Sequence, residues 1–441
     1  MDKTTTIRSE VEKFMGREKL TLSDLGRKTG LNVGSLSSII TGRRTMSVNQ
    51  LDRITKLMEL PEGHFYDLYI QDNMATTQPN WRRLKPFILR CADLDKLDCI
   101  YQVVSWLLDN LVYCPVLFDA AEELLQAGKK EAAAVLYEEV AKTEHSQHSE
   151  RLALCQYRLF KIRLGDDQSL NLQAAAQFEP YAERLDEVLQ LDALKDLANV
   201  YRSLRKWDKV DKFAEMMGVR ARRHYFTKHR QKRNGTNPYS RLSRPLFVYV
   251  AYSDLLRGEA YHEWGDYDQA LEFVSRYADL NWVKENDEEN HHWKELFAGW
   301  AKANRYITKL FSGDFSVLYK YVEYIETNKE DLLLSLLNIV EAANSFNVNI
   351  DDILLHFDSE IKPLGEQMEG TRVYDKRFKA QRYTRLLNEL SNYYLQKGEF
   401  EVGYTYLLES LTKSATLIID NNIVDSVRLL KTPKNKTFVE G

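Results

Sequence analysis

The chain has 441 residues, of which 44% are hydrophobic and 29% charged, with only 9 prolines. A chain of this length is too long for a single hydrophobic core, so we expect more than one domain. The small number of helix-breaking prolines favours a helical protein. The sequence has no run of 18 consecutive apolar residues and no apolar core in its first twelve, so we expect no membrane span, no export and a cytoplasmic location. The net charge of -4 excludes binding to nucleic acid along the whole surface, and any DNA contact must be local.

The first seventy residues carry the local basic charge. Residues 1–70 contain eleven Lys and Arg against nine Asp and Glu, a balance of +2 that leaves -6 for the rest of the chain. Between Arg17 and Lys56 the count is eight against three. A basic surface is therefore expected within this segment.

Five short amphipathic helices are predicted in residues 1–70, and the second and third have the clearest ends. Thr21 with Asp24 three residues later matches a capping box, which begins the second helix. Gly30 suits the left-handed residue that ends it. Asn32 is a good N-cap for a third helix over residues 33–40. The two helices are therefore joined by a tight turn.

The fourth and fifth helices complete this segment. The third helix stops at Gly42, and Ser47 with Gln50 forms a second capping box for the fourth. Pro61 is expected to begin the fifth. The inward stripe of the fourth helix consists of Leu51, Ile54, Leu57 and Met58.

Residues 1–70 resemble the Cro/C1-type helix-turn-helix family. The resemblance rests on Leu25-Gly26, Gly30-Leu31-Asn32, Leu36, Ile39, Gly42 and the helix from Leu51 to Leu60. The sequence departs from the family at Gly26, where alanine is usual, and at Ile40, where glutamate is frequent. We expect both positions to accept small or apolar groups. An ordinary helical bundle is the alternative interpretation.

The resemblance implies that the third helix enters the DNA major groove. The residues that would then face bases are Val33, Gly34, Ser37 and Ser38. None of these residues is an arginine, asparagine or glutamine, whose side chains can make two hydrogen bonds to one base. Specificity should therefore depend on serine hydroxyls, contacts with thymine methyl groups and DNA shape. The residues that would contact phosphates are Asn32, Thr41, Arg43 and Arg44.

Beyond a polar linker at 71–80, a pattern of paired helices recurs over residues 81–425 and leaves a C-terminal tail at 426–441. A helix ends in a glycine or polar pair, and the next begins with an aromatic or charged residue followed by a small one. The turns are at Gly265 and Gly398, with weaker copies at Gly128, Arg205 and Gly313 and degenerate ones near Gly165 and Asn347. We predict an all-α chain whose repeat domain is a right-handed tetratricopeptide-like solenoid of helical hairpins. Irregular helical packing is the alternative.

The combined architecture resembles the RRNPP family of quorum-sensing regulators over essentially the whole chain. The resemblance implies a transcription regulator that binds a double-stranded DNA operator, forms a homodimer and changes its DNA binding when a short linear signalling peptide docks on the repeats. An adaptor that binds proteins through its repeats is an alternative, as is a bifunctional regulator that inhibits a phosphotransfer protein.

Asparagine amides are the candidate peptide-binding groups, because one amide satisfies both a donor and an acceptor of an extended backbone. Asn199 and Asn392 lie six residues before their turns, where peptide-binding tetratricopeptide repeats place such an asparagine. The full candidate set is Asn199, Asn304, Asn338, Asn388 and Asn392. A surface amide or an interhelical hydrogen bond is the alternative for each.

Residues 220–244 form a basic insertion in the repeats. Residues 216–253 contain nine Lys and Arg and no Asp or Glu. Three interpretations stay open for it: a solvated loop, a clamp for a peptide carboxylate, or a further phosphate contact on DNA.

The sequence has no catalytic motif of the phosphate-loop, dinucleotide, zinc-protease or nucleophile-elbow kinds, so we expect no enzyme and no cofactor. The cluster Glu144, His145, His148 and Glu150 is the nearest to a metal site, but it is polar and we expect no metal. The four cysteines are irregularly spaced among apolar residues and are expected to be buried free thiols: Cys91, Cys99, Cys114 and Cys155.

Overall fold

The computed structural model is helical, and it describes residues 6–76, 78–144, 150–230, 238–329, 332–364, 373–417 and 439–440. The predicted all-α class is confirmed. Strands in the described residues are limited to a two-residue parallel pairing of β1 (Val348–Asn349) with β2 (Val439–Glu440). The chain divides into two compact units, residues 1–187 and residues 188–441. No helix in the described ranges is both long enough and apolar enough to cross a membrane.

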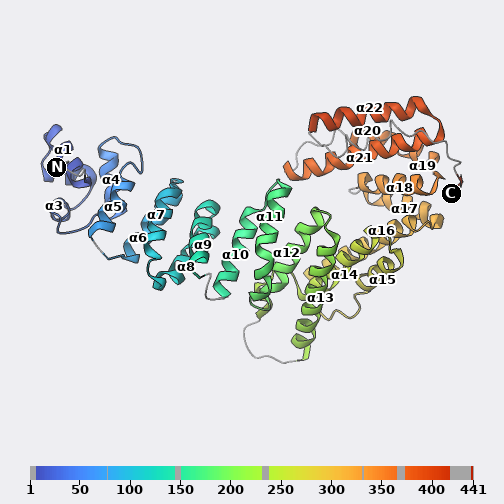
Figure 1. The fold of residues 1–441 in the computed structure, drawn as a ribbon, viewed down its shortest axis with the longest axis horizontal. Coiled ribbons are helices and arrows are strands. Elements are labelled where there is room, and N and C mark those ends of the chain that lie inside the picture. The colour runs from blue at the N-terminus through green and yellow to red at the C-terminus, as the bar shows by residue number, and fades with distance from the viewer. Residues whose placement is uncertain are drawn as a thin grey trace. The chain divides into compact units, whose positions relative to one another are not determined.

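The first unit opens with five short helices, which we call the head, and continues with helices that pack against their sequence neighbours (Figure 1). The head consists of α1 (Ile7–Arg17), α2 (Leu22–Thr29), α3 (Val33–Ile40), α4 (Val48–Leu57) and α5 (Tyr66–Thr76). The rest of the unit consists of α6 (Trp81–Asp93), α7 (Leu97–Leu107), η1 (Leu111–Tyr113), α8 (Cys114–Gln126), α9 (Lys130–Glu144), α10 (Glu150–Arg163), α11 (Gln168–Phe178) and η2 (Glu179–Arg184).

The predicted ends of the second, third and fourth helices are confirmed. Both bonds of each predicted capping box are present at Thr21 and Ser47. Gly30 is left-handed with φ 68°, and the Asn32 side chain accepts from the backbone N–H of Ser35 at 3.1 Å. The fifth helix begins at Tyr66 and not at Pro61, because Gly63 takes φ 75° and residues 62–65 form turns.

The predicted linker is partly helical, and the head shares its core with the helices that follow. α5 continues to Thr76, so residues 71–76 belong to a helix. One cluster of buried apolar side chains runs from Ile7 in α1 to Leu159 in α10. Polar contacts reinforce this packing: Asp52 in α4 accepts from the Tyr66 hydroxyl at 2.9 Å and from Arg90 Nε in α6 at 3.0 Å. The head is therefore packed on α6 and α7.

Two tyrosines of α5 fix the head against α6. The rings of Tyr66 and Tyr69 each lie 5.0 Å from the ring of Phe87, centroid to centroid. The Tyr69 hydroxyl also donates to the carbonyl of Met46 at 3.0 Å. Met46 lies in the turn between α3 and α4, so α5 holds that turn in addition to its contact with α6.

The second unit consists mainly of long helices, and most of them pack against a neighbour in the sequence. They are α12 (Leu189–Ser203), α13 (Trp207–Arg230), η3 (Pro238–Arg241), α14 (Leu246–Glu263), α15 (Tyr267–Ala278), α16 (Glu288–Phe311), η4 (Phe315–Val317), α17 (Leu318–Thr327), α18 (Leu332–Phe346), α19 (Asp351–His356), α20 (Asp358–Leu364), α21 (Val373–Lys397) and α22 (Phe400–Leu417). Each long helix from α12 to α16 packs on the next, as do α18 with α21 and α21 with α22.

The five sequence turns with the clearest pattern each lie between two packed helices. The residue at each turn has a positive φ, which a left-handed helix stop requires. The values are 79° at Gly128, 54° at Arg205, 79° at Gly265, 88° at Gly313 and 84° at Gly398. Asn347, at one of the degenerate turns, has φ 56°.

The basic insertion is in large part a helix. α13 extends without a break to Arg230, so the first eleven residues of the segment 220–244 belong to it. Acidic partners in α14 and in the segment between α15 and α16 hold this extension. Arg222 Nη2 lies 2.7 Å from Asp254 Oδ1 in α14, and Lys228 Nζ lies 2.7 Å from Glu285 Oε1. The loop interpretation is therefore wrong for residues 220–230.

Candidate nucleic-acid interface and ligand site

The turn between α2 and α3 holds the two helices unusually close. The Leu31 N–H donates to the Gly26 carbonyl at 3.1 Å. A Cβ at position 26 would lie 2.9 Å from that same Leu31's carbonyl oxygen and 3.0 Å from Val33 Cγ2. The expectation that position 26 accepts small or apolar groups is therefore wrong, since even the methyl group of alanine would displace the turn. Ile40, the other departure from the family pattern, is half-buried and packs on the head core.

The predicted base-contacting residues lie on the outer side of α3. Gly34 is exposed, Val33 is 41% exposed, and Ser37 and Ser38 are half-buried. The Ser38 hydroxyl donates to the Gly34 carbonyl at 2.9 Å, so its proton is already used inside the helix. Ser38 retains only acceptor capacity toward a ligand.

Three of the four predicted phosphate-contacting residues lie just after α3, whereas the fourth, Asn32, is the exposed N-cap at its start. Thr41, Arg43 and Arg44 are exposed, and the Thr41 hydroxyl donates to the Ser37 carbonyl at 2.8 Å. Arg8 in α1 completes a basic cluster that sequence reasoning missed. Its guanidinium covers Gly42, where a Cβ would collide with it. No local pattern indicates this contact, since 34 positions separate the two residues.

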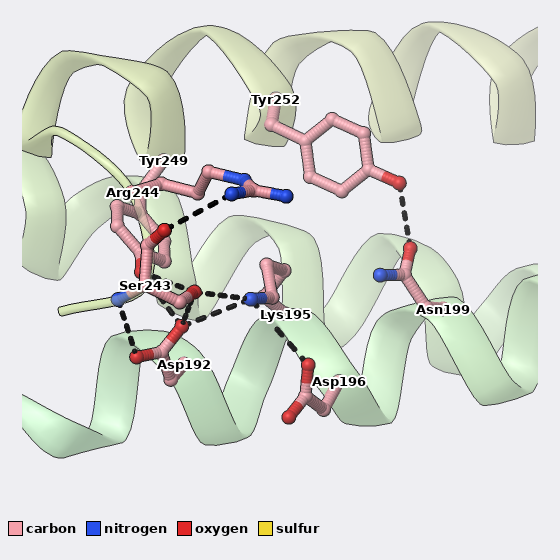
Figure 2. Close-up of polar contacts among 8 residues, drawn as sticks. All are labelled: Asp192, Lys195, Asp196, Asn199, Ser243, Arg244, Tyr249 and Tyr252. Carbon is pink, nitrogen blue, oxygen red and sulfur yellow. Dashed lines mark hydrogen bonds and ion pairs between the residues drawn. The ribbon is translucent and has the colours of Figure 1, made fainter.

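In the second unit, a row of polar contacts joins α12 to α14 (Figure 2). The Tyr252 hydroxyl donates to Asn199 Oδ1 at 2.6 Å. Further along the same pair of helices, Arg202 pairs with Glu259, and Arg205 Nη2 lies 2.6 Å from Glu263 Oε2. These contacts connect the first helices of two successive hairpins.

Asp192 is the buried end of this row. It accepts from the Tyr249 hydroxyl at 2.7 Å, from the backbone N–H of Ser243 at 3.0 Å, from the Ser243 hydroxyl and from Lys195 Nζ at 2.9 Å. Burial raises the pKa of this carboxyl, but the hydrogen bonds from Ser243, Tyr249 and Lys195 outweigh burial and lower it. Asp192 therefore stays ionised and ties the segment before α14 to α12.

The five candidate asparagines are distributed over four helices. Asn199 lies in α12, where Oδ1 is occupied by Tyr252 and Nδ2 has no partner in the described residues. In α16, Asn304 Nδ2 donates to the Tyr277 hydroxyl at 2.9 Å. Asn338 in α18 is half-buried. In α21, Asn392 Oδ1 accepts from Gln396 at 2.7 Å, and Asn388 is buried, so it offers little surface to a ligand.

Two glutamates, in α14 and α18, are half-buried and have raised pKa values. Burial raises the pKa of Glu259 despite its pairing with Arg202, and Glu259 Oε2 is buried without a hydrogen bond. Burial also raises the pKa of Glu341 in α18 to about 7, with Arg385 opposing and Glu389 adding to the shift. Burial therefore favours the neutral form of both carboxyls.

No family model matches the chain, and no curated protein is significantly similar to it. The described residues contain no group of three His, Cys, Asp or Glu side chains placed to hold a metal ion. Residues 145–149, with two histidines of the candidate cluster, lie outside the described residues. The four cysteines are buried and free, as predicted.

Proposed function

We propose that this chain is a DNA-binding transcription regulator whose operator binding is controlled by a short signalling peptide. The observation that carries the DNA-binding part is the geometry of α2 and α3. A left-handed glycine and a close helix approach set α3 with small side chains outward, beside the exposed Arg43 and Arg44. This is the arrangement that a recognition helix needs. An operator selected from a random DNA library supplies the probe.

The double variant Arg43→Ala, Arg44→Ala tests the phosphate contacts. Since each arginine would neutralise about one phosphate, the variant should weaken binding to all DNA sequences alike and lower the salt slope of the affinity by up to about two units. The matched control is Lys13→Ala, because Lys13 is exposed on α1 and pairs only with Glu10 among the described residues. An unchanged affinity and slope in the double variant would contradict the proposed interface.

For sensing, we propose that the paired helices from α6 onward are tetratricopeptide-like repeats in a right-handed superhelix and that the peptide lies along their inner helices. The positive φ at every well-defined sequence turn supports the repeat assignment. Asn199 supports the peptide site, since its unused Nδ2 can donate to a peptide carbonyl. Native mass spectrometry after incubation with spent culture medium identifies the peptide.

Calorimetry with that peptide on Asn199→Ala and Asn392→Ala tests the amides. Each variant should lose about 1–3 kcal/mol of binding free energy if a buried peptide group is left unsatisfied. Circular dichroism confirms that the helices are intact. Wild-type affinity in both variants would place the peptide elsewhere.

We further propose a homodimer on a pseudo-palindromic operator, because two recognition helices must face successive major grooves. Sedimentation of the free and the DNA-bound protein measures this directly. A monomer in both states would contradict it.

A further inference from the structure

We propose that Arg244 binds a carboxylate of the ligand, the C-terminal carboxylate of a short linear peptide, on the side of α12 and α14 that carries Lys195 and Asn199 (Figure 2). The inference rests on the proposed peptide-binding function and names one of its contacts. The sequence leaves three interpretations open for the basic insertion at residues 220–244. For its last residue, Arg244, we choose the clamp for a peptide carboxylate.

The backbone that carries Arg244 is fixed before any ligand arrives. The neighbouring Ser243 donates its N–H and its hydroxyl to the buried Asp192, and Lys195 Nζ donates to the Ser243 hydroxyl oxygen at 2.8 Å. Pro245 follows, and α14 begins at Leu246. A binding group held in this way loses little conformational freedom when a ligand binds.

The charge of Arg244 is available. Its guanidinium lies 5.1 Å from the Trp293 ring centroid in α16 and donates only to the Ser243 carbonyl, at 3.2 Å. Among the described residues it has no carboxylate partner. In contrast, Arg222 and Lys228 of the same insertion are paired with Asp254 and Glu285. Stacking on an aromatic ring holds the planar guanidinium and leaves its edge for an anion.

The surroundings of Arg244 suit a monoanion. Figure 2 shows its guanidinium over the row of α12 side chains, between Tyr249 and Tyr252. Lys195 is already paired with Asp192 and Asp196, at 2.9 and 3.5 Å, so its charge is neutralised and Arg244 is, among the described residues, the cation left for a ligand at this place. One free cation matches a single negative charge better than the dense charge of a DNA backbone. A single carboxylate matches the guanidinium fork with two hydrogen bonds.

Asn199 extends the site along α12. Its Nδ2, which has no described partner, can donate to a backbone carbonyl of a peptide whose C-terminal carboxylate lies at Arg244. The half-buried rings of Tyr252 and Trp293 lie beside Asn199 and Arg244 respectively, so the surroundings of the two polar groups are partly aromatic. The site therefore fits the C-terminal end of a peptide in extended conformation.

Two peptide pools test the proposal without knowledge of the natural ligand. One is a pool of random-sequence heptapeptides with free C-terminal carboxylates, and the other is the same pool amidated at the C-terminus. The full-length protein is equilibrated with each pool, separated by gel filtration, and the retained peptides are quantified by mass spectrometry. We expect the wild type to retain about tenfold more of the free-acid pool, and Arg244→Ala to reduce that retention about tenfold.

The conservative variant Arg244→Lys should recover part of the retention, since it keeps the charge and loses the fork. The matched control Arg223→Ala removes an exposed arginine of α13 and should retain both pools like the wild type. Equal retention of the two pools by the wild type, or unchanged retention by Arg244→Ala, overturns the carboxylate site and leaves peptide sensing intact. Retention of neither pool overturns both.

Discussion

The head and the α12–α16 helices hold together by different chemistry. In the head, the buried side chains at the centre are apolar, including Leu25, Leu36 and Leu51, and the polar side chains mainly cap helix ends. Between α12 and α16, buried carboxylates are tied to basic side chains and hydroxyls: Asp192 to Lys195 of its own helix and to the Tyr249 hydroxyl in α14, and Asp254 to Arg222 in α13. The head should therefore respond mainly to changes in packing, and α12–α16 to changes in protonation.

The largest difference in stability between the two regions is expected at acid pH, because of Glu285. Burial raises the pKa of this carboxyl, but bonds from Lys228 and Tyr225 outweigh it and lower the pKa from 4.5 to about 2. Its stabilisation is therefore complete above about pH 4.5 and is lost as the pH falls toward 2, a loss of up to about 3 kcal/mol. Urea unfolding at about pH 6 and at about pH 3, followed by tryptophan fluorescence, measures this loss of unfolding free energy. The probe is suitable because the Trp282 ring lies 5.0 Å from the Tyr225 ring, centroid to centroid, and residues 1–76 contain no tryptophan.

The variant Glu285→Gln should flatten this pH dependence, while Glu295→Gln, which removes an exposed carboxyl of α16, should leave it unchanged. Identical pH dependence in the wild type and Glu285→Gln would show that Lys228 and Tyr225 do not hold an ionised carboxylate.

Packing should dominate in the head, and Gly26→Ala is the sharpest test. The added methyl group would lie 2.9 Å from the Leu31 carbonyl oxygen, so the turn must shift, at a cost of about 2 kcal/mol and with weaker DNA binding. Hydrogen exchange of the α2 and α3 amides measures the cost. Gly16→Ala is the control, since a Cβ there meets nothing within 4 Å and should stabilise α1 by up to about 1 kcal/mol. Equal protection in the two variants would mean that the close approach is absent.

Polar bonds also join α4 to α5 and α6. Tyr66→Phe removes one hydrogen bond to Asp52 and keeps the ring on Phe87, so it should cost about 1 kcal/mol of unfolding free energy. Tyr101→Phe is the matched control, because Tyr101 is 49% exposed. A cost no larger than that of the control would show that Arg90 alone satisfies Asp52.

The smallest effect is expected on α3. Ser37→Ala should weaken binding to selected operators by less than about 1 kcal/mol, whereas Ser38→Ala should change less, since the Ser38 proton is donated to Gly34. Fluorescence anisotropy with several operators compares them. A larger loss for Ser38→Ala would show that DNA accepts this proton in place of the helix carbonyl.

Local signals in the sequence predict much of the fold. The capping residues Thr21, Asn32 and Ser47, and the stops at Gly30 and Gly265, act on their own helix ends, so a few neighbouring residues determine them. The start of α5 was missed because Gly63, and not Pro61, decides it. The helix over 71–76 has little apolar periodicity of its own and forms at the end of a segment that packs on α6 and α7.

The candidate sites depend on contacts that have no local signal. Asp192 and Ser243 are 51 positions apart, and Arg244 and Trp293 lie in different hairpins. Asn199 was predicted from its repeat position, but its pairing with Tyr252 was not. A run of basic residues shows its charge in the sequence, whereas only the folded chain shows which of these charges already have partners.

The core shared by the head and the helices after it has a consequence for protein engineering. A chimaera that exchanges the head between two chains of this architecture could be joined after Thr76. That junction would separate Tyr66 and Tyr69 from Phe87, and would leave Arg90 facing a foreign α4. The compact unit that contains the head ends at residue 187, so a cassette that keeps this core intact is more than twice as long as residues 1–70.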